Sequence, residues 1–249
     1  SSAIPGLGSH GLHAGWQSIN DGHDAERIED SMARAAHDAK QALRARGKQF
    51  GRMLGAGLNG HVYATNEPGK IVKLDKGDNE SRLAQFVMKD PELSQMRGLP
   101  RYFGAEPTGV KDGLSGKEVH AITREDISDL PDDLKKNDSA RFHFKRLRDF
   151  LNKVGHAISQ GEIDQDDYED RVIGRLDRTD LLNLPGKIHP SFAPVMKDLR
   201  RMIERGIVPC DLHLSNWGQR SSTGEFVMRD LGCFSVVNRG QPVGATQGG

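Results

Sequence analysis

Three polar residues near the carboxy-terminal end of the sequence have types and a spacing that suit acid–base and metal chemistry. Asp211 and Asn216 stand five positions apart on one predicted loop, and Asp230 follows them. A carboxylate can accept the proton of an attacking hydroxyl, and an amide oxygen can bind Mg²⁺ without adding charge. A hairpin predicted over residues 216–228, with its turn at "SSTG", would return Asp230 to the same place. Taken singly, each aspartate is more commonly a turn residue or a helix cap.

A glycine-rich stretch, "LGAGLNGHV", occupies residues 54–62 and has the pattern G-x-G-x-x-G-x-V. Glycines allow backbone N–H groups to approach a phosphate closely. The pattern alone is weak, but a strand and not a helix follows it, which favours a loop folded over nucleotide phosphates from a hairpin. The residues predicted to contact a nucleotide here are Gly55, Ala56, Gly57, Leu58, Asn59, Gly60 and Val62.

Two charged residues follow this stretch, Lys73 in "IVKL" and Glu80 in the first turn of the next predicted helix. Taken alone, a lysine on a strand is more commonly a surface residue with a buried stem. A carboxylate in a first helical turn ordinarily compensates the helix dipole. Together, Lys73 and Glu80 could be the pair that orients a lysine on the α- and β-phosphates of a nucleotide.

The elements that must position these residues run from strands to helices. Residues 1–24 have no apolar period and predict a flexible tail, and apolar residues at helical spacing then predict a helix over 25–49 that Gly47 stops. Further along, the patterns predict two hairpins, a short helix, a mostly helical segment and one strongly amphipathic helix. These cover residues 61–74 and 105–124, residues 79–90, residues 131–190 and residues 190–206.

Composition excludes some classes of protein. The 249 residues carry 35 Lys and Arg against 35 Asp and Glu, so net charge gives no argument for a nucleic acid or an anionic membrane. A basic run over 141–148 and an acidic one over 162–170 indicate solvated helix faces. No apolar run approaches a membrane span, and no signal peptide opens the sequence. Cys210 and Cys233 are too few and too badly placed for a disulfide scaffold, which favours a reducing compartment and apolar packing of both thiols.

Taken in order, these features resemble the protein-kinase superfamily over roughly residues 50–235. The resemblance implies an α+β, two-lobed fold. It comprises a strand-rich N-lobe over 50–127 and a reduced, mainly helical C-lobe over 128–249, with "ITREDI" (122–127) where the hinge between the lobes should be. It also implies ATP and Mg²⁺ as cofactors.

The resemblance assigns a role to each of these residues. By this resemblance, Asp211 would be the catalytic base, and Asn216 and Asp230 would bind Mg²⁺. Lys73 holds the phosphates and Glu80 positions Lys73, as expected for a kinase. Thr123, in the hinge sequence, completes the set of predicted nucleotide contacts together with the glycine-rich stretch.

The departures from the family pattern indicate which kind of kinase the sequence resembles. Pro209 and Cys210 replace the usual His-Arg before Asp211, so no arginine stands there to bind a phosphorylated activation loop. His213, two residues after Asp211, also looks like aminoglycoside and choline kinases. Only 17 residues follow Gly232. In this short stretch after the triplet, the sequence resembles the minimal kinases that bacterial pathogens inject into host cells. A phage-encoded or toxin kinase is an equally fair relative, and truncation of a longer protein is a further alternative.

We therefore expect a monomeric, constitutively active Ser/Thr protein kinase that acts on a protein substrate, a host protein being one candidate. It would have no nucleic-acid or membrane partner, and it would be cytoplasmic or secreted by a bacterium into the host cytoplasm. Three alternatives stay open at this point: a small-molecule phosphotransferase, a nucleotide-binding pseudokinase that acts as a scaffold, and an enzyme of the same fold that transfers AMP.

Overall fold

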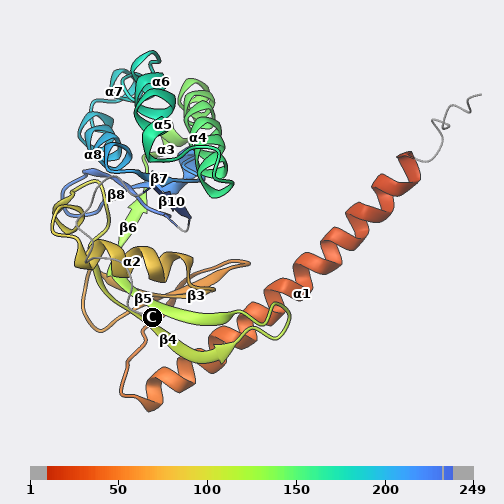
Figure 1. Ribbon diagram of the computed structural model, residues 1–249. Coiled ribbons are helices and arrows are strands. Elements are labelled where there is room, and N and C mark those ends of the chain that lie inside the picture. Colours follow the sequence, from red (N-terminus) through yellow and green to blue (C-terminus); the bar gives the residue numbers. More distant parts are fainter. Residues whose placement is uncertain (1–9, 232, 238–249) are drawn as a thin grey trace, which may run out of the picture. The chain divides into compact units, whose positions relative to one another are not determined.

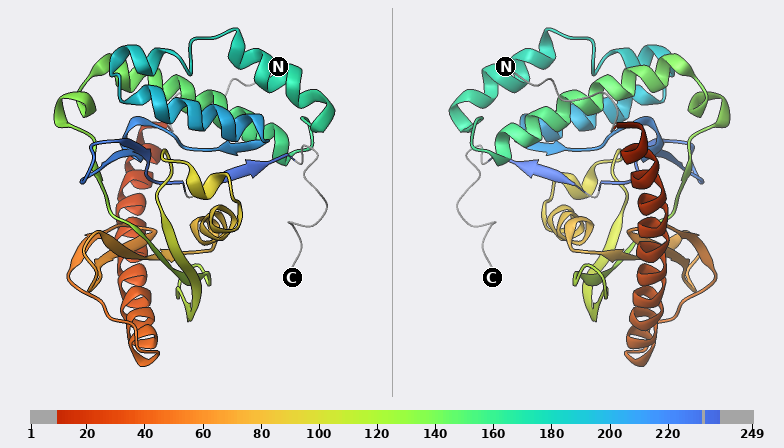
Figure 2. Two further views of the ribbon diagram at one scale, coloured as in Figure 1. Left: turned by 90° about the vertical axis from the view of Figure 1, so that its left-hand side faces the viewer. Right: turned by 90° about the vertical axis from the view of Figure 1, so that its right-hand side faces the viewer.

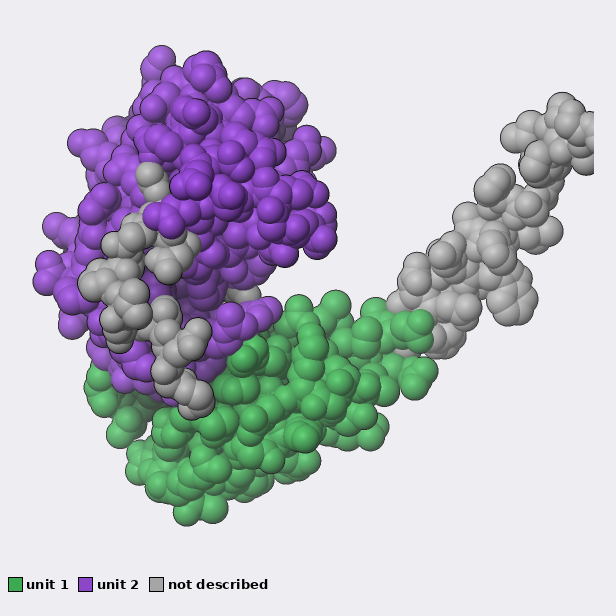
Figure 3. Space-filling view, in the orientation of Figure 1, with its two compact units in different colours: residues 1–78, 106–122 green, residues 79–105, 123–249 purple. Residues whose placement is uncertain are grey.

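The computed structural model of the chain describes residues 10–231 and 233–237, with side chains from residue 24 onward. The chain forms two compact units, which Figure 3 shows in different colours. The first unit holds residues 1–78 and 106–122, and the second holds residues 79–105 and 123–249. The chain therefore passes into the second unit for the last time between residues 122 and 123, within the stretch predicted to be a hinge.

One long helix and a five-stranded antiparallel sheet carry the first unit (Figure 1). The sheet order is β1-β2-β3-β5-β4, and the last two strands also run into the residue range of the second unit. Both predicted hairpins are confirmed as neighbouring strand pairs. The elements are α1 (His10–Ala45), β1 (Met53–Ala56), β2 (Gly60–Ala64), β3 (Lys70–Lys76), β4 (Tyr102–Lys111) and β5 (Glu118–Glu125).

Helix α1 packs one apolar face on this sheet. Small and medium side chains of the helix, from Met32 to Leu43, form a buried cluster with strand residues that include Tyr63, Leu74 and Val119. Alanines make up much of the helix side of this cluster, which lets helix and sheet approach closely. Gly47 follows the helix at φ 89°, a left-handed conformation that glycine adopts readily, so the predicted stop is confirmed.

The second unit is mainly helical, with two small sheets in the orders β6-β8-β9 and β10-β7. The mostly helical segment predicted over 131–190 is confirmed. The helices of the second unit are α2 (Asn79–Lys89), η1 (Leu93–Gln95), α3 (Asp132–Lys135), α4 (Asp138–Ser159), α5 (Gln165–Tyr168), the π-helix η2 (Glu169–Ile173), α6 (Gly174–Asp177), α7 (Leu184–Ile188), α8 (Phe192–Glu204) and η3 (Leu214–Asn216). Its strands are β6 (Ile127–Asp129), β7 (Ile207–Pro209), β8 (Trp217–Arg220), β9 (Phe226–Met228) and β10 (Phe234–Val236).

Aromatic side chains hold the core of this unit together. Phe144 of α4 lies 4.9 Å from Phe192 of α8 and 5.2 Å from Trp217 of β8, measured between ring centroids. Phe192 in turn lies 4.8 Å from Phe226 of β9. Helices α4 and α8 also both contact β7, as can be followed in the two views of Figure 2. This core anchors the strand and the hairpin that precede and follow Asp211.

The predicted class, α+β with a strand-rich part followed by a mainly helical part, is confirmed. Helix α1 begins at His10 and runs without interruption into the predicted helix, so it extends into the segment for which a tail was predicted (1–24). Residues 1–9 lie outside the described residues. A sequence without an apolar period can still be helical where no proline interrupts it, and none occurs between Pro5 and Pro68. The lobe boundaries stay a prediction.

The helices in the described part of the chain do not have the properties of a membrane span. Among the described residues, none of them combines the length and the apolar character that crossing a bilayer would need.

Candidate active site

The first unit brings the glycine-rich stretch and Lys73 together. Strands β1 and β2 form its two arms, and the Gly57 N–H donates a 2.9 Å hydrogen bond to the Gly60 carbonyl across the turn. Lys73 lies on β3 directly opposite Val62 of β2. A half-buried lysine cation thus stands on the strand next to the predicted phosphate loop.

Gly60 is the glycine of this loop that packing requires. A Cβ atom at this position would lie 3.0 Å from the Leu74 carbonyl oxygen and 3.4 Å from Cε of Lys73. At Gly55, by contrast, a Cβ atom would meet nothing within 4 Å. The bare backbone at Gly60 therefore leaves the space along which the Lys73 side chain runs.

In the second unit, Asp211 is held in an unusual backbone conformation. Its φ is 57°, and no other non-glycine residue among the described residues has a positive φ. Such a conformation is uncommon outside glycine and needs support from its surroundings. Asn152 of α4 supplies it: its side-chain oxygen accepts the Asp211 N–H at 2.8 Å, and its amide donates to the Asp211 carboxylate at 3.0 Å. Asn216 adds a 2.5 Å bond from its amide to the Asp211 carbonyl.

Asn216 and Asp230 also meet, as the predicted hairpin requires. Strands β8 and β9 pair antiparallel, with Trp217 opposite Met228. The N–H groups of Arg229 and Asp230 then donate to the Asn216 carbonyl at 2.8 and 3.3 Å. Because the amide nitrogen of Asn216 is engaged with Asp211, its side-chain oxygen is left as an acceptor.

A group of buried charges surrounds the Asp230 carboxylate. Arg124 of β5, 5% exposed, lies 3.8 Å from Asp230 and 3.5 Å from the fully buried Glu80 of α2, measured between nitrogen and oxygen. Arg229 lies 3.6 Å from the same aspartate. Burial raises the pKa of the neighbouring Tyr102 hydroxyl, and the charge of Glu80 raises it further. Arg124 therefore connects the predicted helix glutamate with the predicted metal ligand.

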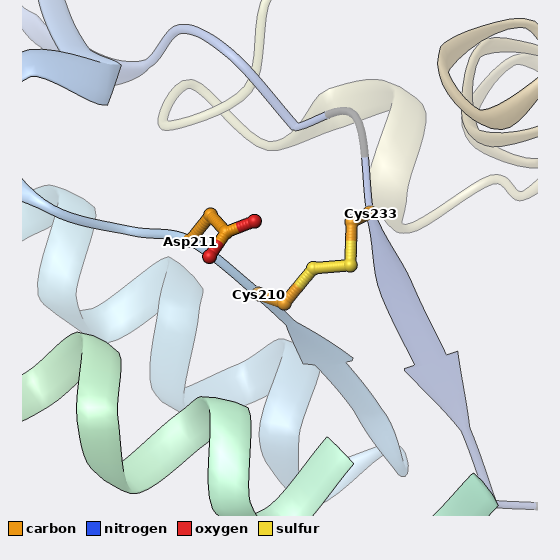
Figure 4. Close-up of side chains that lie close together, drawn as sticks. All are labelled: Cys210, Asp211 and Cys233. Atoms are coloured by element: carbon orange, nitrogen blue, oxygen red, sulfur yellow. A yellow bond between two sulfur atoms is a disulfide. The ribbon is translucent and has the colours of Figure 1, made fainter. Parts of the chain in front are cut away.

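The two cysteines are disulfide-bonded, which corrects the expectation that they pack as free thiols. Strand β7 pairs antiparallel with β10, so that Pro209 faces Phe234 and the two cysteine Cα atoms lie 5.4 Å apart. This long-range pairing was invisible in the cysteine spacing. Figure 4 shows the Asp211 side chain beside the bond. The carboxylate and the two sulfurs are close enough to hold a metal, but sulfurs bonded to each other offer no thiolate.

The residues predicted to bind Mg²⁺ have suitable chemistry for it. Asn216 offers an amide oxygen and Asp230 a carboxylate, the hard oxygen ligands that Mg²⁺ prefers. The backbone bond between the two residues places them next to each other. Asp230 is partly exposed, and the two arginines near it compensate a single carboxylate. The donor set is therefore of the kind that Mg²⁺ uses, while the two arginines compete with a cation for the Asp230 carboxylate.

The remaining predicted residues fall in different units. Lys73 belongs to the first unit, while Glu80 and the half-buried Thr123 belong to the second. The pairing of Lys73 with Glu80 and the nucleotide contact of Thr123 stay predictions. Sequence reasoning missed Asn152 and Arg124. Arg124 stands among other polar residues of its strand, "EVHAITRE", and nothing in the helix marked Asn152, so neither residue carried a signal in the sequence.

No protein-family model and no curated protein matches the chain. Among solved structures, the chain is similar to the kinase PK-1 of the Cydia pomonella granulovirus, with 13% sequence identity and a TM-score of 0.40. The match covers 80% of this chain and 59% of the length of that kinase. A similarity this weak does not establish a common fold, and no activity follows from it.

Proposed function

We propose that this chain is an ATP- and Mg²⁺-dependent kinase that transfers the γ-phosphate to a Ser or Thr hydroxyl of a protein. The observation that carries the proposal is the grouping of Asp211, Asn216 and Asp230 by direct hydrogen bonds in one place of the second unit. The sequence resemblance supports it, because these positions match the catalytic loop and the metal-binding triplet of kinases. Gly232, the last residue of the triplet, lies outside the described residues.

In the proposed reaction the substrate hydroxyl oxygen attacks the γ-phosphorus. The bond from that phosphorus to the bridging oxygen breaks, and ADP leaves. Asp211 accepts the hydroxyl proton, and its carboxylate is aimed by Asn152. Mg²⁺, when bound by Asn216 and Asp230, would neutralise charge on the phosphates. Lys73 and the glycine-rich loop would hold the nucleotide. Such catalysis depends mainly on positioning and electrostatics.

The proposed kinase would be constitutively active. Pro209 and Cys210 stand where an arginine would otherwise contact a phosphorylated loop, and Cys210 is bonded to Cys233. The local structure around Asp211 is instead fixed by Asn152 and by the disulfide. Treatment of the purified protein with a phosphatase should therefore leave its activity unchanged. A loss of activity that an upstream kinase restores would contradict this part of the proposal.

The first test is label transfer from γ-labelled ATP in the presence of Mg²⁺, with the protein alone and with a eukaryotic or bacterial cell lysate. Asp211→Ala should lower the rate by roughly 10²–10⁴-fold, and Asp230→Ala should abolish transfer. Asp170→Ala, at an exposed position in η2, is the matched control and should retain full activity. The labelled bands would identify the substrate.

Three outcomes would replace this proposal with one of its rivals. Label on an aminoglycoside or choline, and not on protein, would indicate a small-molecule phosphotransferase. Label from α-labelled ATP and none from γ-labelled ATP would indicate AMP transfer. ATP binding without any transfer would indicate a pseudokinase. The most specific function proposed is that of a bacterial effector, and label that appears only on host proteins would support it.

A further inference from the structure

A basic pocket lies in the second unit on a face of α4 that the proposed reaction does not use. Its volume is about 440 Å³. Residues of α4 form one side, and residues of η2 and α6 form the other. Figure 1 labels α4 and α6. The cations that line it are Arg146, Lys153, Arg171 and Arg175, and Asp149 is the acidic residue that lines it.

The cations of this pocket are poorly neutralised by the protein. Lys153 and Arg175 make no ion pair or side-chain hydrogen bond with any residue of the described ranges. Arg171 donates to a backbone carbonyl, and Arg146 makes an exposed pair with Asp180 at 3.4 Å. The lining carboxylate of Asp149 is engaged by Arg148 at 2.9 Å. The pocket therefore carries an excess of positive charge.

Acidic residues stand near the pocket but do not line it. The segment over 162–170 is acidic, and two features limit its effect. Asp164 uses its carboxylate as the N-cap of α5, accepting the N–H groups of Asp166 and Asp167. The other carboxylates are exposed, where water and salt screen their charge. Exposed carboxylates around the pocket weaken the long-range attraction of an anionic ligand. They have less effect on the direct contacts that this ligand makes with the cations inside the pocket.

The floor of the pocket is apolar. Phe150, Val154 and Leu181 are among the side chains that line it, and the last two are buried. A site of this volume falls in the range that small-molecule ligands occupy, and an apolar floor with a few charged groups at the rim is their usual setting. The π-helical turn that carries Arg171 is a rare conformation that occurs frequently at functional sites.

We propose that this pocket binds a small molecule that carries two or more phosphate groups on a ring. Guanidinium groups bind phosphate oxygens in pairs and with charge-assisted strength. The apolar floor provides a surface for the carbon face of the ring. A polyphosphate without a ring would use the cations alone. The site is independent of Asp211 and the proposed phosphoryl transfer.

The test uses the full chain and measures binding by isothermal titration calorimetry in EDTA, so that no Mg²⁺ supports a nucleotide elsewhere. The probes are inositol hexakisphosphate, adenosine 3′,5′-bisphosphate and pyrophosphate. We expect saturable one-to-one binding of a ring probe with a Kd of about 1–100 µM, and weaker binding of pyrophosphate. The two ring probes distinguish an inositol phosphate from a nucleotide. Added salt should weaken the binding.

Arg171→Ala/Arg175→Ala should weaken binding of the ring probe by at least about tenfold. Arg178→Ala is the matched control, because Arg178 is exposed at the end of α6 and does not line the pocket. Lys153→Ala provides a second variant at an exposed position, should the double variant unfold. Asp211→Ala should bind as the wild type does. Equal affinity of the pocket variants and the wild type, or no binding of any probe at about 1 mM, would overturn the proposal.

Discussion

Asn152 and Asp211 are joined by two hydrogen bonds, one through the backbone N–H of the aspartate and one through its carboxylate. The asparagine side chain thus binds both the backbone and the carboxylate of Asp211. It supports the positive φ of Asp211 and at the same time fixes the direction of the carboxylate. Because Asn152 lies in the 22-residue helix α4, whose apolar face is buried, its own position is well determined.

The first prediction concerns this pair. Asn152→Ala should lower kcat of the proposed kinase by roughly 10- to 100-fold, since small displacements of a catalytic group are costly. The KM for ATP should change little, because Asn152 contacts the base and not the proposed nucleotide residues. Steady-state kinetics with a peptide substrate would show this split. The variant should retain its secondary structure by circular dichroism.

Asn183→Ala is the control for that measurement, because Asn183 is exposed at the start of α7 and its side chain caps no helix. It should leave both kinetic constants unchanged. A parallel loss of ATP affinity and kcat in Asn152→Ala would indicate general unfolding of the loop, and the positioning role would then be wrong.

The second prediction concerns Arg124 and the buried Glu80. Arg124→Leu removes the cation that lies 3.5 Å from the fully buried Glu80 carboxylate, so it should lower the free energy of unfolding by up to about 3–5 kcal/mol. Adding Glu80→Leu should recover part of this loss, because both charges of the buried pair are then replaced by apolar side chains. Urea unfolding of the two single variants and the double variant measures the coupling. Additive losses would show that the two side chains do not interact.

The third prediction concerns the disulfide. Its two cysteines are 23 positions apart in the sequence, and a loop of that size should contribute about 3 kcal/mol of stability in the chain-entropy account. Cys210→Ser/Cys233→Ser should be destabilised by about that amount relative to the oxidised wild type. Urea unfolding with and without dithiothreitol checks it, with thiol counts by mass spectrometry. The reductant should not affect the double variant.

The fourth prediction separates two glycines of the same loop. An alanine Cβ at position 60 would press on the Leu74 carbonyl, so Gly60→Ala should lower the free energy of unfolding by about 1–3 kcal/mol. Gly55→Ala meets open space and should stay within about 0.5 kcal/mol of the wild type. Thermal and urea unfolding would measure both. Equal losses would mean that the loop packs differently around Gly60.

Local patterns predicted much of the fold. The stripe of helix α8 is buried as its spacing requires, and Gly206 ends the helix at φ 82°. The hairpin that joins Asn216 to Asp230 follows from the "SSTG" turn, where Gly224 adopts φ 72°. Such features depend on neighbours in the sequence, so turn residues and apolar period are sufficient to find them.

The partners of the site could not be predicted in this way. Asn152 and Asp211 are 59 positions apart, and their meeting depends on how α4 packs beside β7. The contact between Arg124 and Asp230 depends on the path of β5. The cysteines meet because β7 and β10 pair, and short strands at that distance carry little signal in a single sequence. Pairings of this kind come from tertiary packing and not from local preference.

The last prediction concerns pH and Asp112, a buried residue in the turn between β4 and β5 that ties this turn to α1. Burial raises the pKa of its carboxyl, but hydrogen bonds from Ser115 and from Ser31 of α1 outweigh this and lower the pKa to about 2. The folded chain therefore releases the proton more readily than the unfolded chain. The resulting stability is complete above about pH 4 and is lost as the pH falls towards 2. Asp112→Asn lacks this contribution, so its deficit against the wild type should be about 2 kcal/mol near neutral pH and should shrink as acid is added. Urea unfolding at several pH values between 7 and 2.5 would measure the deficit, and Asp38→Asn, at an exposed position of α1, should show no such dependence. A deficit that stays constant over this range would show that the ionised carboxylate is not the source of the stability.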